Sequence, residues 1–195
     1  ATIDESIFSK EHGITGVIPY VAHAFPNAKV VPIVIRDGTA NTITDGIAAE
    51  LSKLNLKNTV IVGTIDMSHY LPKYIADAHD RLTVESIKSF NYDVLPRLDI
   101  DTAPTLRTIM KVAETTGQKN FIQTGGVNSA EIVNDSDLLV TTSYITGYFS
   151  KNMVKEDDKF ASVNTKSAHM LFVGDIMLDR GVAIGNRLGF NTLRS

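Results

Sequence analysis

The chain has 195 residues, of which 43% are hydrophobic, and it carries a formal net charge of −3 and no cysteine. This length is enough for about one to one and a half domains with a buried core. The lack of cysteine excludes disulfides and thiolate metal ligands, and it is compatible with a cytoplasmic protein. Interspersed charges argue against nucleic acid as a partner, and no apolar run reaches the ~20 residues that span a membrane.

The first third of the sequence predicts a helix, a strand and a second helix. Apolar residues recur with helical spacing over residues 14–25, and Pro19 is expected to kink that helix. Residues 29–36, which are rich in valine and isoleucine, predict a strand, followed by a turn at residues 37–38. A capping-box variant at Thr42 then predicts a helix to about residue 54.

The middle of the sequence continues the alternation of strand and helix. We expect a strand over residues 59–65, a long helix over 72–90 and another helix over 104–116, with Gly117 at its end. A weak strand over 121–124 and a strong one over 138–149 follow. This alternation predicts an α/β fold with a mainly parallel sheet covered by helices.

Polar side chains follow the predicted strand 59–65 in the segment Gly63-Thr-Ile-Asp-Met-Ser-His-Tyr70. Open α/β sheets bind ligands at the carboxyl ends of their strands, so Asp66, Ser68 and His69 are expected at such an edge. A carboxylate and an imidazole three residues apart can hold a metal ion or move a proton. The alternative is that Asp66 caps the next helix and that His69 is a hydrogen-bonded structural residue.

Two blocks of sequence resemble the Memo family, specifically the prokaryotic branch called AmmeMemoRadiSam system protein B. The first is the 63–70 segment with Ala76-Asp-Ala-His-Asp-Arg-Leu-Thr83, although Thr64-Ile65 replaces two serines that are usual in the family. The second is Glu11-His-Gly-Ile-Thr-Gly-Val-Ile-Pro-Tyr20. The resemblance covers about residues 10–150.

The resemblance implies a three-layer α/β/α fold, similar to class III extradiol dioxygenases, and a metal pocket for iron, copper or zinc. It places His69, Asp66 and His12 in catalytic roles, with His69 and Asp66 as metal ligands. It also implies that the chain is truncated at its N-terminus, because members of the family are longer there and supply two further histidines from that region. A family cysteine expected around residues 98–105 is absent.

The composition changes after residue 150. A charged stretch without an apolar face reads as a linker over residues 151–167, which divides a Memo-like domain at 1–150 from a segment at 168–195. That segment contains Gly174-Asp-Ile-Met-Leu-Asp-Arg180 and resembles the start of a truncated capsule-synthesis (PGA-cap) domain with a metallophosphatase-like fold. By that resemblance Asp175 would be a metal ligand; the alternative is that Asp175 caps a turn.

Three hypotheses of function follow. The first is a metal-dependent redox or oxygenase-type protein, linked by family to radical-based modification with radical-SAM and AMMECR1-type partners. The second is a binding module of the same fold without catalysis. The third is a part of a capsule or polysaccharide synthesis protein, which would imply the cell envelope instead of the cytoplasm.

Overall fold

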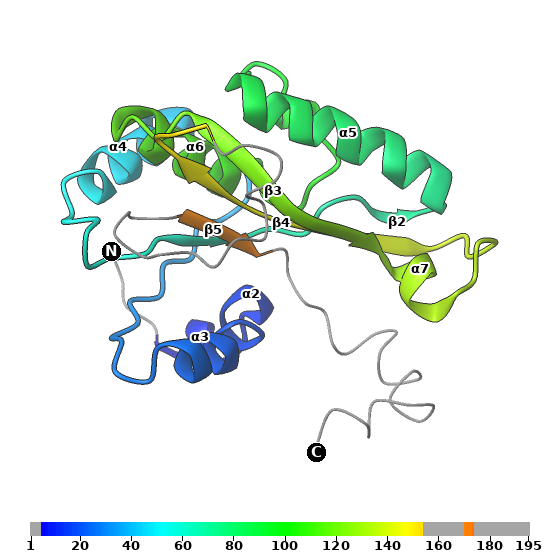
Figure 1. Cartoon of the computed structure of the whole chain (residues 1–195), viewed down its shortest axis with the longest axis horizontal. Helices are drawn as coiled ribbons and strands as arrows, with labels where there is room; N and C mark the ends of the chain where they lie inside the picture. Colours follow the sequence, from blue (N-terminus) through cyan, green and yellow to red (C-terminus); the bar gives the residue numbers. More distant parts are fainter. Residues whose placement is uncertain (1–4, 154–169, 174–195) are drawn as a thin grey trace. The chain divides into compact units, whose positions relative to one another are not determined.

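The structure is a computed structural model that describes residues 5–153 and 170–173 (Figure 1). The chain divides into two compact units between residues 34 and 35. The first unit carries three short helices, and the second carries the sheet and the helices that pack on it. The predicted linker and almost all of the segment 168–195, including Asp175, lie outside the described residues.

The first unit contains α1 (Glu5–Phe8), α2 (His12–Thr15) and α3 (Ile18–Ala24). The single helix expected over residues 14–25 is therefore two helices. Pro19 sits in the first turn of α3, where its missing N–H leaves no helical bond unmade. Glu11 begins α2 as its N-cap, with its side chain accepting a hydrogen bond from the Gly13 N–H.

The strand predicted over residues 29–36 is wrong for the described structure. These residues lie in no helix and no strand. The β-branched composition predicts an extended chain, but a strand also needs a neighbour for its backbone hydrogen bonds. No neighbour is present within the residues that the structure describes.

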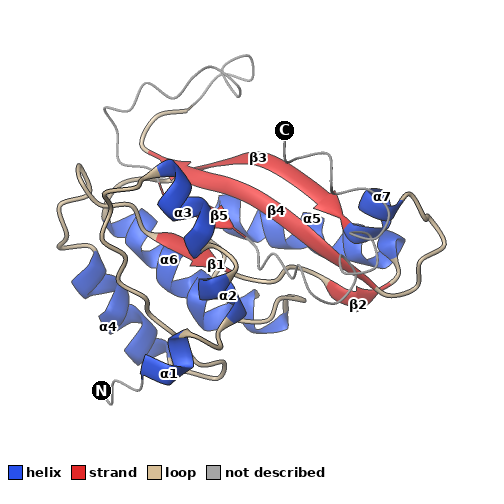
Figure 2. Ribbon diagram, turned by 90° about the horizontal axis from the view of Figure 1, so that it is seen from below, coloured by secondary structure: helices blue, strands red, loops and turns tan. Residues whose placement is uncertain are grey.

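The sheet of the second unit is built around its longest strand. The strands are β1 (Val62–Thr64), β2 (His69–Leu71), β3 (Asn120–Asn128), β4 (Thr141–Ser150) and β5 (Met170–Val173). β3 and β5 pair with the same stretch of β4 on opposite edges, and β2 pairs with the first residues of β4 (Figure 2). Among the described strands only β1 and β5 pair in parallel, and the other pairs are antiparallel. The mixed α/β class is thus confirmed, whereas the mainly parallel sheet is not.

Helices cover one face of this sheet. The helices of the second unit are α4 (Asn41–Leu51), α5 (Lys73–Ser89), the 3-10 helix η1 (Leu95–Arg97), α6 (Ala103–Thr115) and α7 (Ser129–Val133). α5 packs on β3 and β4, and α6 packs on β1 with α4 against its other side (Figure 2). None of the described helices is both long and apolar enough to cross a membrane.

The core lies between the sheet and these helices. β4 alternates buried and half-buried residues along its whole length, as expected for a strand with one face on a core. Its inward face contributes Ile145 and Phe149, and α6 contributes Leu106 and Met110. α6 ends as predicted, because Gly117 has a φ of 76° just past its last residue.

Candidate functional site

The segment with the candidate site residues joins β1 to β2. β1 ends at Thr64, so Asp66 and Ser68 follow directly after a strand, as the sequence predicted. Both residues are buried, whereas His69 is half-buried in β2. The segment between the two strands is therefore part of the interior rather than a surface loop.

Ser68 is held from both sides by backbone hydrogen bonds. Its N–H donates to Oδ1 of Asp80 on α5 at 3.3 Å, and its carbonyl accepts from the N–H of Ser143 on β4 at 2.8 Å. Its hydroxyl donates to the carbonyl of Ala76 at 3.4 Å. These bonds fix the chain between α5 and β4 immediately before His69.

Asp66 is tied to the loop that precedes α6. Its N–H donates to Oδ1 of Asp101 at 3.0 Å, and the N–H of Asp101 donates back to the Asp66 carbonyl at 3.2 Å. This reciprocal pair positions the backbone that carries the Asp66 carboxyl group.

The two hydrogen bonds between Asp66 and Asp101 predict that Asp101→Ala destabilises the segment that follows β1. The Asp66 N–H would lose its acceptor, and we expect the free energy of unfolding to fall by about 1–2 kcal/mol. Hydrogen exchange at the Asp66 amide should speed up in parallel. Asp101→Asn keeps an amide oxygen that can accept this hydrogen bond. We therefore expect a smaller fall in the free energy of unfolding and a smaller rise in the exchange rate of the Asp66 amide. Equal losses in the two variants would show that this hydrogen bond does not hold the segment.

The His69 ring has a defined orientation. Nδ1 lies 3.0 Å from the carbonyl oxygen of Met67, and since a carbonyl only accepts, Nδ1 must carry the proton. In the neutral imidazole this leaves the lone pair on Nε2. Metal-binding histidines commonly donate their other ring N–H to a backbone carbonyl or a carboxylate. The ring thus has the arrangement of a ligand or a base that acts through Nε2.

Tyr70 has an unusual backbone conformation next to this ring. Its φ is 60°, a left-handed value that is uncommon for a bulky residue, and the β2–β4 register shifts at this point. The Tyr70 ring meets the His69 ring edge-on, with 4.8 Å between centroids. The irregularity interrupts the regular β2–β4 pairing between His69 and Leu71.

The other two predicted site residues lie outside the described part of the second unit. His12 lies exposed on α2 in the first unit, and Asp175 lies outside the described residues. Within residues 5–153 and 170–173 no group of three or more histidine, aspartate or glutamate side chains could hold a metal ion. Among the described residues, Asp66 and His69 are therefore not part of a complete ligand set.

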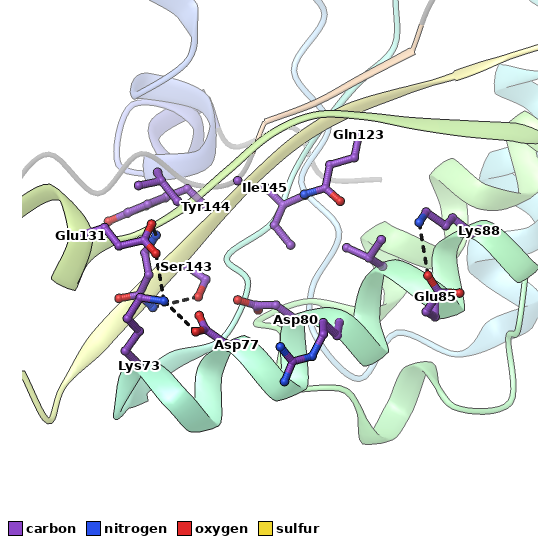
Figure 3. A pocket seen from close by; sticks show the side chains of 15 residues that line it. Lys73, Asp77, Asp80, Glu85, Lys88, Gln123, Glu131, Ser143, Tyr144 and Ile145 are labelled. Carbon is purple, nitrogen blue, oxygen red and sulfur yellow. Dashed lines mark hydrogen bonds and ion pairs between the residues drawn. The ribbon is translucent and has the colours of Figure 1, made fainter. Parts of the chain in front are cut away.

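A groove of about 450 Å³ runs between α5 and the strands β3 and β4 (Figure 3). Asp80 lines it, so the carboxylate that holds Ser68 also faces the groove. Lys73 Nζ contacts Asp77 at 2.6 Å and Glu131 at 2.9 Å. Lys88 pairs with Glu85 farther along α5. Most charged side chains that line the groove therefore form ion pairs with one another.

These contacts shift the protonation equilibria in the directions expected of ion pairs. Hydrogen bonds to Asp77 and then Glu131 raise the pKa of Lys73. The hydrogen bond from Lys73, followed by that from the Asn128 backbone, lowers the pKa of Glu131. Both groups therefore stay charged at neutral pH, and neither is poised as an acid or base.

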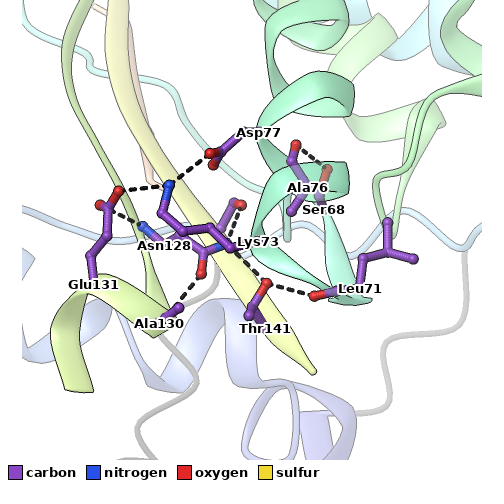
Figure 4. A network of polar contacts seen from close by, with 10 residues as sticks. Ser68, Leu71, Lys73, Ala76, Asp77, Asn128, Ala130, Glu131 and Thr141 are labelled. Carbon is purple, nitrogen blue, oxygen red and sulfur yellow. Dashed lines mark hydrogen bonds and ion pairs between the residues drawn. The ribbon is translucent and has the colours of Figure 1, made fainter. Parts of the chain in front are cut away.

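A polar network connects this ion cluster to β2 (Figure 4). Asn128 Nδ2 donates to the hydroxyls of Thr141 at 2.9 Å and Ser143 at 3.1 Å. The Thr141 hydroxyl donates to the Leu71 carbonyl at 2.8 Å. Because Leu71 ends the strand that begins with His69, the network fixes the far end of β2.

A second hollow of about 430 Å³ lies beside the N-terminal ends of α4 and α6. Arg107 at its edge binds both carboxylate oxygens of Asp45 at 2.8 Å, which lowers the pKa of Asp45. Tyr92 lies beneath Arg107, and burial is the main reason that the pKa of its hydroxyl is raised. These contacts connect α4 to α6, so their role is structural.

The comparison with protein families identifies the chain. The model of the Memo-like protein family matches residues 1–141. The chain belongs to the Memo-like family. The match contains both sequence blocks that carry the resemblance, so that prediction is confirmed at the level of the family.

Two curated proteins illustrate what this Memo-like chain is similar to. A MEMO1 family protein of Sulfurisphaera tokodaii is 27% identical over 130 residues, which cover 62% of this chain and 46% of the relative. A MEMO1 family protein of Sulfolobus acidocaldarius is 29% identical over 130 residues, covering 62% and 45%. The chain thus spans about half the length of the relatives it matches. No solved structure matches it significantly.

The sequence did not point to several residues that shape the surroundings of the 66–71 segment in this Memo-like chain. Asn128 and Glu131 form a capping box at the start of α7, and the run Asn128-Ser-Ala-Glu131 is a recognisable signal for it. Gly125-Gly126 suggests a turn in the sequence but lies inside β3, where the register with β4 shifts. Asp80 and Asp101 carry no local signal, because their partners are 12 and 35 residues away.

Proposed function

We propose that this Memo-like chain contributes His69 and Asp66 to the metal site of a metal-dependent redox or oxygenase-type protein. The observation that carries the proposal is the hydrogen bond between His69 Nδ1 and the Met67 carbonyl. It commits the proton to Nδ1 and leaves Nε2 as the atom that would bind a metal. The segment is held without His69 itself, because Ser68 and Asp66 donate backbone hydrogen bonds to Asp80 and Asp101, and Ser143 donates one to Ser68.

In this proposal the two side chains have different tasks. His69 is a ligand through Nε2, and it acts as a base wherever that atom faces a substrate instead. Asp66, which is 8% exposed, supplies a carboxylate from the same segment as a second ligand or as the group that orients the first. When bound, iron or copper supplies redox chemistry, whereas zinc supplies only Lewis-acid chemistry.

The ligand set needs members besides these two, since catalytic metal sites of this kind use about three protein ligands. The catalytic role of His12, which lies in the first unit, stays a prediction. The alignments leave more than half of each relative's length uncovered, so additional ligands have room outside this chain. Radical-SAM and AMMECR1-type partners, a role for Asp175 in a capsule-type domain, and a cytoplasmic location remain predictions.

A binding module without catalysis is the second candidate. The observation in its favour is that the described residues form no group of three metal ligands. The charges that line the groove are mostly paired with one another, as in a structural interface. A chain of this kind would keep its fold in full and bind no metal.

Metal content distinguishes the two candidates. The chain would be incubated with iron, copper and zinc in turn, dialysed, and analysed by mass spectrometry next to His69→Ala and His79→Ala. His79 is a matched control, because it lies exposed on α5 and pairs with Asp99 rather than with the site segment. We expect His69→Ala to lose bound metal and His79→Ala to keep it, with both circular dichroism spectra unchanged. Metal bound equally by all three proteins would refute the role of His69, and no metal in any of them would favour the binding module.

A further inference from the structure

Two hydrogen bonds to β4 hold the chain on either side of His69. Before it, the Ser68 carbonyl accepts from the Ser143 N–H at 2.8 Å. After it, the Leu71 carbonyl accepts from the Thr141 hydroxyl at 2.8 Å. These two anchors are three residues apart on the chain that carries His69, but only two residues apart on β4. The chain with His69 must therefore accommodate one extra residue between the anchors.

This extra residue produces a bulge at Tyr70. Along the ladder, His69 lies opposite Thr142. Leu71 lies opposite Thr141, so β2 advances by two residues while β4 advances by one. Tyr70 lies at this step with a φ of 60°, a conformation that a bulky residue keeps only where the surrounding structure imposes it. Bulges commonly occur beside functional sites, where they change the direction of a side chain.

The proton of the Thr141 hydroxyl is directed toward the Leu71 carbonyl by Asn128 (Figure 4). The side-chain oxygen of Asn128 accepts from the Ala130 N–H at 2.9 Å, which fixes the orientation of the amide. Its Nδ2 therefore faces the Thr141 hydroxyl at 2.9 Å, and an amide nitrogen only donates. The hydroxyl accepts from Asn128 and keeps its single proton for the Leu71 carbonyl.

Burial makes this hydrogen bond difficult to replace. Thr141 is 2% exposed and Asn128 is 3% exposed, so water has little access to the position of the hydroxyl. If the hydroxyl is removed, the Nδ2 group of Asn128 loses an acceptor and the Leu71 carbonyl loses a donor. Unsatisfied polar groups in a buried network are costly, which favours a local rearrangement of the chain.

We propose that Thr141 is a positioning residue for His69, because its hydroxyl holds the bulge at Tyr70 and thereby the orientation of the imidazole. With the chain fixed on both sides, Nδ1 of His69 stays 3.0 Å from the Met67 carbonyl and the lone pair stays on Nε2. Loss of the hydroxyl releases the Leu71 end, so the left-handed residue relaxes and the ring turns. The use of Nε2 by a metal rests on the proposed function, whereas the orientation of the ring does not.

The test is the tautomer of His69 in the metal-free chain. It is measured from the ¹⁵N shifts of the imidazole nitrogens at a pH at which the ring is neutral, with His69→Ala to assign them. Thr141→Val keeps the shape of the side chain but lacks the hydroxyl, and we expect its shifts to move toward those of the Nε2–H form. Thr141→Ala removes the same hydroxyl and should give the same change. Thr141→Ser keeps the hydroxyl and should keep the wild-type shifts.

Thr124→Val is the control for a general loss of stability. It removes a threonine hydroxyl that lies 3.1 Å from the hydroxyl of Thr146, in a part of the sheet that does not pair with β2. We expect this variant to unfold at a lower urea concentration than the wild type, with the His69 shifts unchanged. Wild-type shifts in both Thr141→Val and Thr141→Ala would overturn the proposal, as would an equal change of shifts in Thr124→Val.

Zinc titration of the same proteins separates this inference from the proposed function. For a wild-type chain that binds Zn²⁺, Thr141→Val should raise the dissociation constant about 10–100-fold, as expected when a group that orients a metal ligand is lost. Equal affinities in the two proteins would contradict a role of Thr141 at the metal site. A wild-type chain that binds no zinc, together with the expected change of shifts, would favour the binding module and still support Thr141 as the positioning residue of His69.

Discussion

Gly147→Ala should be among the most destabilising single substitutions in this chain. A Cβ at this position would lie 2.5 Å from Cζ of Phe121 and 2.8 Å from the carbonyl oxygen of Ile122. The ring could turn aside, but the carbonyl belongs to the β3–β4 ladder, in which Gly147 lies opposite Gln123. Relief of the clash therefore moves the strands apart. We expect a loss of about 3 kcal/mol in the free energy of unfolding, measured by urea denaturation.

Gly46→Ala is the matched control for that substitution. Gly46 lies inside α4, and a Cβ there would meet no atom within 4 Å. Alanine is a better helix former than glycine, so we expect this variant to gain about 0.5–1 kcal/mol. Opposite signs for the two glycines would confirm that the close approach of β3 and β4 requires glycine. A neutral Gly147→Ala would mean that the two strands are farther apart than described.

Phe149→Ala is expected to have a comparable or larger effect. The Phe149 side chain is fully buried, with its ring centroid 5.2 Å from that of Phe121 and 5.5 Å from that of Phe90. It links β4 to β3 and to the end of α5, so its removal leaves a cavity that neither can fill. The expected loss is about 3–5 kcal/mol, measured by urea denaturation.

Two further variants show whether that loss comes from the cavity. Phe149→Leu keeps much of the volume and is expected to cost about 1–2 kcal/mol. Tyr74→Ala removes an aromatic ring that is 74% exposed on α5, and it should change stability by less than about 0.5 kcal/mol. A Phe149→Ala variant as stable as Tyr74→Ala would contradict the placement of β4 in the core.

The elements that the sequence predicted well are those with strong local signals. The helix expected over residues 72–90 is α5, because Pro72 suits a helix start and the apolar spacing continues for several turns. The helix expected over 104–116 is α6, ended by Gly117. In both cases the stabilising contacts lie within a few residues along the chain, so the sequence alone contains them.

Strands were predicted less well, because a strand depends on a partner that sequence does not identify. The run at 29–36 has stronger β-branched character than β3, yet it pairs with no strand among residues 5–153 and 170–173, whereas β3 pairs with β4 along its length. The same dependence explains the sheet. Alternating strands and helices favoured parallel pairing, but β3 and β4 are joined only by the short helix α7 and pair antiparallel.

For the candidate site, the sequence predicted that Asp66 and Ser68 follow a strand, which the structure confirms, and it supplied the prediction that Asp66 and His69 carry the chemistry. It also placed the chain in the Memo-like family, which the family model confirms. The contacts that hold the segment became visible with the fold: they involve Asp80 on α5, Asp101 before α6 and Ser143 on β4. The physical reason is the range of the forces involved. Helix periodicity and capping act between neighbours along the chain, whereas these hydrogen bonds join residues that only folding brings together.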